Sequence, residues 1–341
     1  AFSSLKPILG DSRPSKRKDA AIAVLNGVVG DYLEAERNPL AISMQWRSAD
    51  GLLLDTDDKL QQIWEHSNGR LLLMIHGSCT TPHDWWREGR NHGISLAEAL
   101  DYTPIFLHYN SGLHISENGK QLATSLNRLA ESSLTKIPLS LVIVAHSMGG
   151  LVARSACYYA EKEGEEYNSH QWLEVLSHMV MLGSPHHGAI LEQGGKLVDA
   201  VLGAHPYTEP ISWLGKIRSN GVMDLGYGNV RDEDWLGVSS GSGMGDFREP
   251  APLPRLVKCL AIAGVLGDLN SSSSRLFGDT GRTDGLVTQS SALGGGQSDP
   301  AMNLKFDEEF TVFGQSHFGL LSSEKVYDTM VSFLSPTGSR L

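Results

Sequence analysis

The run Ala145-His146-Ser147-Met148-Gly149-Gly150 decides the fold of this chain. Apolar residues 141–145 lead into it, and an apolar helical pattern over 151–160 follows it. A strand, a sharp turn and a helix in this order present a serine as a nucleophile at the top of a sheet. Because such a turn is strained, its flanking positions must be small, and here they are alanine and two glycines. The pattern predicts that Ser147 is a nucleophile.

Short apolar runs alternate with helical patterns along the rest of the chain. Strands are expected over residues 71–75, 104–108, 139–145, 176–182, 255–263 and 309–313, with an edge strand over 42–47. Helices are expected over about 116–132, after the serine turn, and over about 323–334. Apolar strands separated by helices indicate a mostly parallel central sheet that helices flank on both faces. The predicted fold class is therefore α/β.

A Gly-rich, irregular stretch from about 188 to 254 interrupts this rhythm and is too long for a plain loop. We interpret residues 189–254 as an inserted cap, or lid, over the carboxyl ends of the strands. A structural excursion with no role in substrate binding is the alternative. The α/β core then spans 41–188 and 255–341, after an N-terminal helical extension over 1–40. An apolar patch over 20–29 starts well inside the chain and contains Asn26, so it favours an amphipathic helix over a signal peptide.

The composition excludes several classes of protein. The 341 residues carry a formal net charge of −11, which argues against binding to nucleic acid. No apolar run approaches the roughly 20 residues of a membrane span, so stable membrane insertion is not expected. The three cysteines are too few and too far apart for a disulfide framework, and no Cys/His spacing suggests zinc. We expect no cofactor, no metal and a cytoplasmic location, with a secreted protein as the alternative, and the sequence predicts no oligomeric state.

Ser147 needs a base, and His317 is the best candidate because it follows the last apolar strand and precedes the last helix. His146 adjoins the nucleophile, but neighbours in such a turn point apart, so it is a poor base. His186 and His187 follow a strand and are expected to shape a turn.

The base needs a carboxylate that fixes its tautomer. Asp284, before a glycine and an apolar pair, suits this role, and Asp268 and Asp279 are rivals. The order Ser, Asp, His along the chain is that expected of a nucleophile on such a turn.

An acyl transfer also needs backbone N–H donors for the oxyanion. Met148, directly after the nucleophile, should supply one, and Ser78, in the loop that opens with His76-Gly77, the other, with Cys79 as the alternative. Trp85, Trp86 and Trp213 are candidates for lining a substrate pocket, although they could equally pack beneath the cap.

Five motifs together resemble those of the α/β-hydrolase superfamily, specifically bacterial lipases and carboxylesterases. They are the Ala-x-Ser-x-Gly turn, His76-Gly77, Gly183-Ser-Pro-His-His-Gly188, Thr283-Asp-Gly-Leu-Val287 and Ser316-His-Phe-Gly-Leu320. The resemblance covers about 71–334 and implies an α/β-hydrolase fold. Residues 1–40 and the stretch Asn110-Ser-Gly-Leu-His-Ile-Ser116 fall outside the family pattern.

The resemblance implies hydrolysis of a carboxylic ester, small or lipid-like, through an acyl-serine. Thioesterases, amidases, phospholipases and acyltransferases share the same machinery, so these activities remain alternatives. A catalytically silent binding protein on the same fold is the alternative from a different class.

Overall fold

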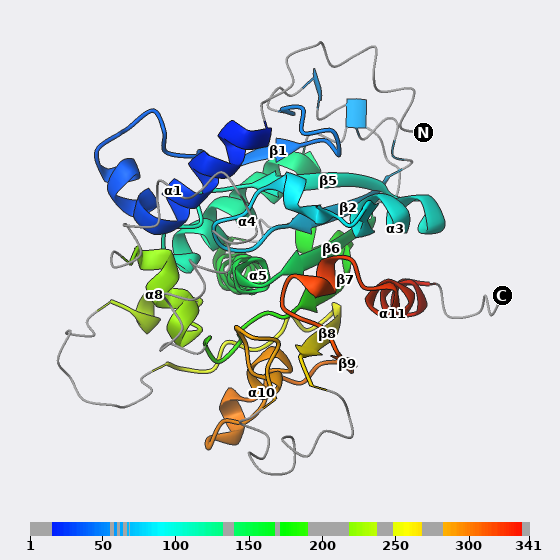
Figure 1. Cartoon of the computed structure of the whole chain (residues 1–341). Helices are drawn as coiled ribbons and strands as arrows, with labels where there is room; N and C mark the ends of the chain where they lie inside the picture. The colour runs from blue at the N-terminus through cyan, green and yellow to red at the C-terminus, as the bar shows by residue number, and fades with distance from the viewer. Residues whose placement is uncertain are drawn as a thin grey trace.

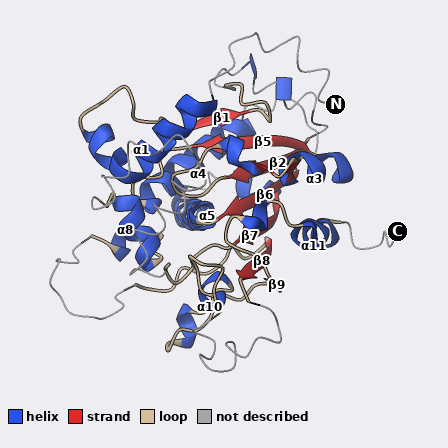
Figure 2. Ribbon diagram, in the orientation of Figure 1, coloured by secondary structure: helices blue, strands red, loops and turns tan. Residues whose placement is uncertain are grey.

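A seven-stranded sheet with the order β1-β5-β2-β6-β7-β8-β9 forms the centre of the molecule (Figures 1 and 2). The computed structural model describes residues 16–54, 58–59, 62–63, 67, 69–131, 140–167, 171–189, 218–236, 248–267 and 282–335. The strands are β1 (Gln45–Arg47), β2 (Arg70–Ile75), β5 (Thr103–His108), β6 (Ser140–His146), β7 (Leu176–Leu182), β8 (Lys258–Val265) and β9 (Glu308–Phe313). Only β1 runs antiparallel to its neighbour in this sheet, and the other pairs are parallel. The predicted mostly parallel sheet is confirmed.

Helices cover both faces of the sheet, as the continuous apolar strands predict. Figure 1 shows α4 and α5 on one side and α3 and α11 on the other. The bounds of these helices are α3 (His92–Leu100), α4 (Ile115–Glu131), α5 (Met148–Tyr167) and α11 (Glu324–Leu334). Alternate residues of β2 enter the two halves of the core: Leu71 and Leu73 pack on the α4–α5 side, and Leu72 on the α3–α11 side. This arrangement, with its strand order, is the α/β-hydrolase fold.

The strand register brings the carboxyl ends of the parallel strands to one edge of the sheet. Ile75 at the end of β2 pairs with Ala145 of β6, and His146 pairs with Leu182 at the end of β7. Val265 at the end of β8 pairs with Phe313 at the end of β9. The loops that follow β2, β6, β7, β8 and β9 therefore leave the sheet side by side, where ligands bind in open α/β sheets.

The N-terminal extension forms α1 (Lys16–Ala35), longer than the predicted patch over 20–29. It packs beside α8 (Asn220–Tyr227), a helix within the segment predicted to be a cap. That segment also contains a short 3-10 turn, Asp232–Asp234. Most of the predicted cap lies outside the described residues, so its role stays a prediction. None of the described helices is long and apolar enough to cross a membrane.

Several element boundaries differ from the predictions. The strand expected over 255–263 begins only at Lys258 and runs to Val265, because a turn closed by Val257 N and Pro254 O precedes it. The edge strand shortens to three residues. Elements that were not predicted include α3, α8, the short α6 (Gln171–Val175) and a hairpin of β3 (Trp86–Arg87) and β4 (Arg90–Asn91). The four-residue α10 (Gln289–Ala292) follows the loop that carries Asp284.

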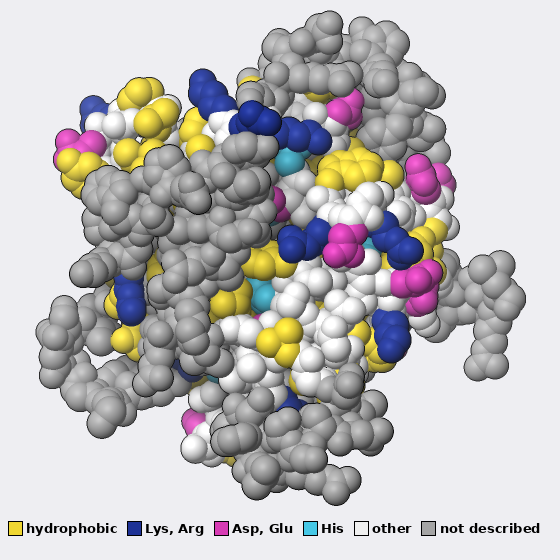
Figure 3. Space-filling model, viewed as in Figure 1, with side chains coloured by type: hydrophobic (Ala, Val, Ile, Leu, Met, Phe, Trp, Pro, Cys, Tyr) yellow, Lys and Arg dark blue, Asp and Glu magenta, His cyan; other side chains and the backbone are white. Residues whose placement is uncertain are grey.

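Figure 3 shows Lys, Arg, Asp and Glu side chains interspersed over one face of the molecule. Hydrophobic side chains gather around a histidine near the middle of that face.

Candidate active site

Ser147 lies between the end of β6 and the start of α5, as the sequence predicts. Its φ is +54°, in the left-handed region that non-glycine residues rarely adopt. Its N–H donates to Leu182 O at 2.9 Å, which ties the turn to the end of β7. A Cβ built on Gly149 would lie 2.7 Å from the carbonyl oxygens of Ile75 and His76, so the turn tolerates only a very small residue there. Backbone strain of this kind is characteristic of functional turns.

Asp284 and His317 are joined by a short hydrogen bond between Nδ1 of the imidazole and Oδ2 of the carboxylate, at 2.7 Å. His317 N also donates to Asp284 O at 3.0 Å, so backbone and side chain hold the two loops together. The other carboxylate oxygen, Oδ1, accepts from Leu286 N at 2.9 Å and Val287 N at 2.8 Å. Both side chains are almost fully buried. With Nδ1 protonated to donate to Asp284, the free nitrogen of His317 is Nε2.

His146 connects the serine turn with the histidine loop. Its ring centroid lies 4.7 Å from that of His317, and its Nε2 lies 3.1 Å from His317 O. Burial, followed by the proximity of His317, lowers the pKa of His146 well below its usual value. The neutral ring therefore donates its Nε2–H to this carbonyl and holds the loop in place. This contact agrees with the expectation that His146 is not the base.

Gly183, directly after β7, lies behind the Asp284–His317 pair. Its φ is +58°, and a Cβ built there would lie 3.2 Å from His317 Nδ1 and 3.3 Å from Asp284 Oδ2. A glycine at this position lets the two side chains approach the sheet. In the sequence, this glycine stands out only as part of the motif 183–188. Its position directly after a strand is the signal that could have identified its contact with the Asp284–His317 pair.

The turn after Gly183 also holds His186 and His187. Their turn is closed by hydrogen bonds from His186 N to Ser184 O and from Gly188 N to Pro185 O. The structure therefore shows both histidines within a turn, as expected.

The loop after β2 packs directly against Ser147. A Cβ built on Gly77 would lie 3.0 Å from Ser147 Cβ, so the loop backbone approaches the serine closely. Neither Ser78 N nor Met148 N has a hydrogen-bond acceptor in the part of the chain that the structure describes. Cys79 N, the alternative donor, is already bonded to Ser111 Oγ at 3.0 Å.

Two buried hydroxyls beside this loop were not identified from the sequence. Thr80 Oγ1 donates to Gly77 O at 2.9 Å, and Ser111 Oγ accepts from Cys79 N. Ser111 belongs to the stretch 110–116 that departs from the family pattern. This departure from the family pattern is the sequence signal that could have pointed to Ser111.

The three predicted pocket tryptophans lie in different surroundings. Trp85 is buried in the core, with its ring edge-on to His146 at a centroid distance of 6.5 Å. Trp86 is 46% exposed on the hairpin. Trp213 lies outside the described residues, as do the rival carboxylates Asp268 and Asp279.

Within the described segments, no group of three or more His, Cys, Asp or Glu side chains could hold a metal ion. The three cysteines are buried and free. Burial raises the pKa of the Cys79 thiol to about 11, so this thiol is not ionised at neutral pH.

Residues 14–223 match the family described as a domain of unknown function, DUF7379. The chain belongs to this family. The matched region includes α1, the loop after β2, and Ser147, while Asp284 and His317 follow it. None of the curated proteins compared with the chain matches it.

Solved structures similar to this chain include lipases and a related protein. The mature lipase BlEst2 of Bacillus licheniformis is 18% identical over 79% of this chain and 93% of its own, with a TM-score of 0.48. Lipase B of Aspergillus fumigatus is 12% identical over 83% of this chain and 58% of its own, with a TM-score of 0.46. A lipase-esterase related protein of Clostridium acetobutylicum is 12% identical over 78% of this chain and 95% of its own, with a TM-score of 0.40.

Proposed function

We propose that this chain is a serine hydrolase that cleaves carboxylic esters through an acyl-enzyme, with Ser147, His317 and Asp284 as its catalytic residues. One observation carries the proposal. A buried Asp284–His317 hydrogen bond of 2.7 Å contacts, through the His317 ring, the ring of His146, and the next residue is a serine in a left-handed conformation. The contact of His146 with His317 brings the serine turn and the histidine loop together.

In the proposed reaction, Ser147 Oγ attacks the ester carbonyl carbon while its proton passes to His317 Nε2. Asp284 holds Nδ1–H and stabilises the imidazolium that forms. The tetrahedral intermediate collapses as Nε2–H protonates the leaving alcohol, which leaves the acyl group on Ser147. Water then attacks the acyl carbon while its proton passes to His317 Nε2, and the second tetrahedral intermediate collapses as Nε2–H returns this proton to Ser147 Oγ and the acid leaves.

The N–H groups of Ser78 and Met148 are the proposed oxyanion donors. Both follow strands that are neighbours in the sheet, and neither has an acceptor among the described residues. The bond from Cys79 N to Ser111 favours Ser78 over Cys79 as the donor. The loss of one such donor typically costs about 2.7–4 kcal/mol of transition-state stabilisation.

The proposed substrate is a small or lipid-like ester. Trp86, which is 46% exposed on the hairpin, is the described tryptophan that we propose to contact the substrate. Residues 189–254 would form a cap over the pocket, with Trp213 within it.

Covalent labelling tests the proposal directly. A fluorophosphonate probe should label the chain, and Ser147→Ala should abolish labelling and lower hydrolysis of p-nitrophenyl esters by a factor of about 10⁴ or more. Ser125→Ala, on α4, is the matched control and should leave both measurements unchanged. A chain that is not labelled would reject the serine mechanism, and turnover of acyl-CoA or amides without turnover of any ester would reject the substrate class.

A further inference from the structure

The direction of the Ser78 N–H is set by the carbonyl of the preceding residue. Gly77 O and Ser78 N–H belong to one planar trans peptide, so fixing the carbonyl also fixes the N–H. Two buried groups donate to Gly77 O: His76 Nδ1 at 2.8 Å and Thr80 Oγ1 at 2.9 Å. Burial lowers the pKa of His76 to about 4, so this ring is neutral near pH 7 and has one N–H for that bond. Thr80 supplies the second bond, with its Oγ1 3.4 Å from His76 Nδ1.

The next peptide, between Ser78 and Cys79, is fixed by a different hydroxyl. Cys79 N donates to Ser111 Oγ at 3.0 Å, and both residues are buried. Cys79 has a φ of +58°, a conformation that costs about 1–3 kcal/mol in a non-glycine residue and persists only where its surroundings impose it. The bond to Ser111 is one such restraint. A hydroxyl group thus restrains each of the two peptides that flank Ser78. Thr80 Oγ1 bonds to the peptide before it, and Ser111 Oγ bonds to the peptide after it.

We propose that Thr80 and Ser111 are positioning residues that aim the Ser78 N–H at the oxyanion. The inference rests on the proposed function, and it extends the active site to two side chains that do not touch the substrate. Thr80 fixes the peptide that carries the donor, and Ser111 fixes the peptide that follows it.

Ser111 itself is held in place from several sides. Asn110 Nδ2 donates to Gly30 O of α1 at 3.0 Å, and Gly221 N of α8 donates to Gly112 O at 3.0 Å. His114 Nδ1 donates to Asp224 Oδ2 of α8 at 2.8 Å. These bonds join the stretch 110–116 to two helices, α1 and α8.

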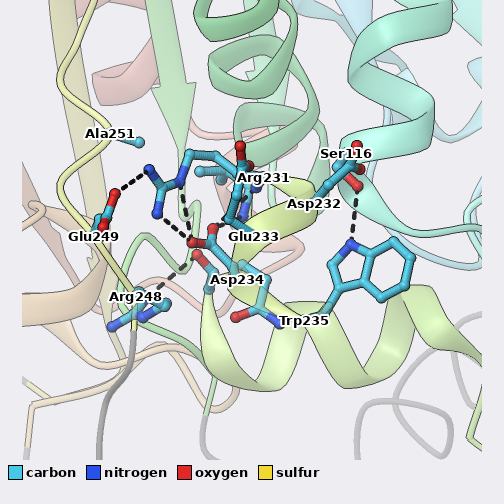
Figure 4. Close-up of polar contacts among 12 residues, drawn as sticks. Ser116, Arg231, Asp232, Glu233, Asp234, Trp235, Arg248, Glu249 and Ala251 are labelled. Carbon is cyan, nitrogen blue, oxygen red and sulfur yellow. Dashed lines mark hydrogen bonds and ion pairs between the residues drawn. The ribbon is translucent and has the colours of Figure 1, made fainter. Parts of the chain in front are cut away.

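At the far end of the stretch, Trp235 Nε1 donates to Ser116 Oγ at 3.1 Å, as Figure 4 shows. The turn that carries Trp235 is itself fixed by the buried pair Arg231–Asp234, at 2.8 Å. Residues 110–116 therefore form a fixed support, from which Ser111 reaches the oxyanion loop.

Removal of either hydroxyl tests the proposal. Thr80→Val keeps the side-chain volume and loses the donor, and Ser111→Ala loses the acceptor for Cys79 N. We expect each variant to lower kcat for a p-nitrophenyl ester between about 10-fold and 100-fold, with KM unchanged. Thr80→Ser restores the hydroxyl and should recover most of the lost kcat.

A trifluoromethyl ketone separates positioning from a general structural effect. Ser147 adds to its carbonyl carbon and forms a hemiketal oxyanion, as the serine proton passes to His317. The inhibition constant should rise by the factor by which kcat/KM falls, because both depend on the same oxyanion. Ser177→Ala removes a hydroxyl that donates to Leu141 O at 3.1 Å near the start of β7, at the opposite end of the sheet from the oxyanion loop, and should leave both values unchanged.

The outcomes distinguish the two proposals. A wild-type chain that hydrolyses no ester contradicts the proposed function, whereas an active wild type with unchanged kcat in folded Thr80→Val and Ser111→Ala overturns the positioning roles. Equal losses in Ser177→Ala also overturn them. Should Thr80→Val fail to fold, Ser111→Ala, which removes a single buried oxygen atom, decides the proposal alone.

Discussion

At the scale of single residues, the two oxygens of Asp284 have separate tasks. Oδ1 accepts two backbone N–H groups of its own turn, and Oδ2 accepts from His317. The turn thus fixes the rotation of the carboxylate before the histidine binds to it. An isosteric change at this position should therefore keep its orientation and change only its hydrogen-bonding character.

Asp284→Asn should retain the fold and lose activity. Its carbonyl oxygen would keep the two turn bonds, which places the NH₂ group toward His317 Nδ1. Nδ1 must then accept, so the proton moves to Nε2, the nitrogen that should accept from Ser147. We expect kcat for ester hydrolysis to fall by a factor of about 10⁴. Asp299→Asn, at the N-cap of a surface turn, is the control, and comparable loss in both variants would contradict this role.

Gly183 offers a test of how tightly the site is packed. In Gly183→Ala, a Cβ would lie 3.1 Å from Leu320 Cδ1 and 3.2 Å from His317 Nδ1, in addition to the strain at φ +58°. We expect kcat to fall about 100-fold, because the histidine must shift. Gly314→Ala is matched, since its φ is +72° but no atom lies within 4 Å of the added Cβ. Because of this backbone strain, Gly314→Ala should lose about 1–3 kcal/mol of the free energy of unfolding, measured by urea titration, but should retain its kcat. Equal kcat in the two variants would show that Gly183 is only a turn glycine.

At the scale of elements, α1 is part of the site's support. A Cβ built on Gly27 would lie 2.1 Å from Cys79 Sγ and 3.0 Å from Cys79 Cα. Ser219 Oγ at the start of α8 donates to Gly27 O, so α1 lies between the cap segment and the oxyanion loop. The helical extension that resembled no hydrolase element therefore contacts the loop with the proposed oxyanion donor.

Gly27→Ala should destabilise the protein although alanine is the better helix former. The clash with Cys79 should outweigh the gain of about 1 kcal/mol in helix propensity, with a net loss of roughly 1–2 kcal/mol in the free energy of unfolding. kcat should fall as well, because Cys79 follows Ser78. The double variant Gly27→Ala, Cys79→Gly removes Sγ and relieves the positive φ, so it should recover stability. If the change in unfolding free energy of the double variant equals the sum of the changes in the two single variants, the two residues are not coupled.

The sequence was most informative where a strand end and a chemical group coincide. Ser147, Asp284 and His317 each follow an apolar strand, and the register brings those strand ends together. The bond between Cys79 N and Ser111 joins two loops that are 32 residues apart, so no local pattern predicts it.

Helix α8 escaped prediction because Gly221 and Gly226 lower its helix propensity. A Cβ on Gly221 would lie 2.1 Å from Ser111 O. Tertiary packing therefore requires a residue that the helix itself disfavours, and this requirement is not visible in the sequence.

At the scale of the whole molecule, burial keeps several histidines of the described segments in a neutral form. Burial is the largest cause that lowers the pKa of each: His76, His92, His108, His146 and His186. Four of them form hydrogen bonds through a ring nitrogen. Neither ring nitrogen of His108 has a hydrogen-bond partner among the described residues. The fold therefore depends on imidazoles that must not take up protons.

Stability should therefore fall as the solution becomes acidic. Each of these histidines binds a proton in the unfolded chain below about pH 6.5 but stays neutral in the folded chain until its lowered pKa is reached. The contribution of each neutral histidine to the free energy of unfolding is complete above about pH 6.5. This contribution is lost as the pH falls toward the folded-state pKa, by up to about 1.4 kcal/mol per pH unit for each histidine.

His108→Leu removes one of these proton-binding groups without breaking a hydrogen bond. The slope of unfolding free energy against pH, measured by urea titration between about pH 5 and 6.5, should decrease by up to about 1.4 kcal/mol per unit. Above about pH 7.5 the two slopes should coincide, because the imidazole is then neutral in both states. Identical slopes in the acidic range would mean that His108 takes up its proton in the folded protein. Burial would then impose no penalty on the charge of this imidazole.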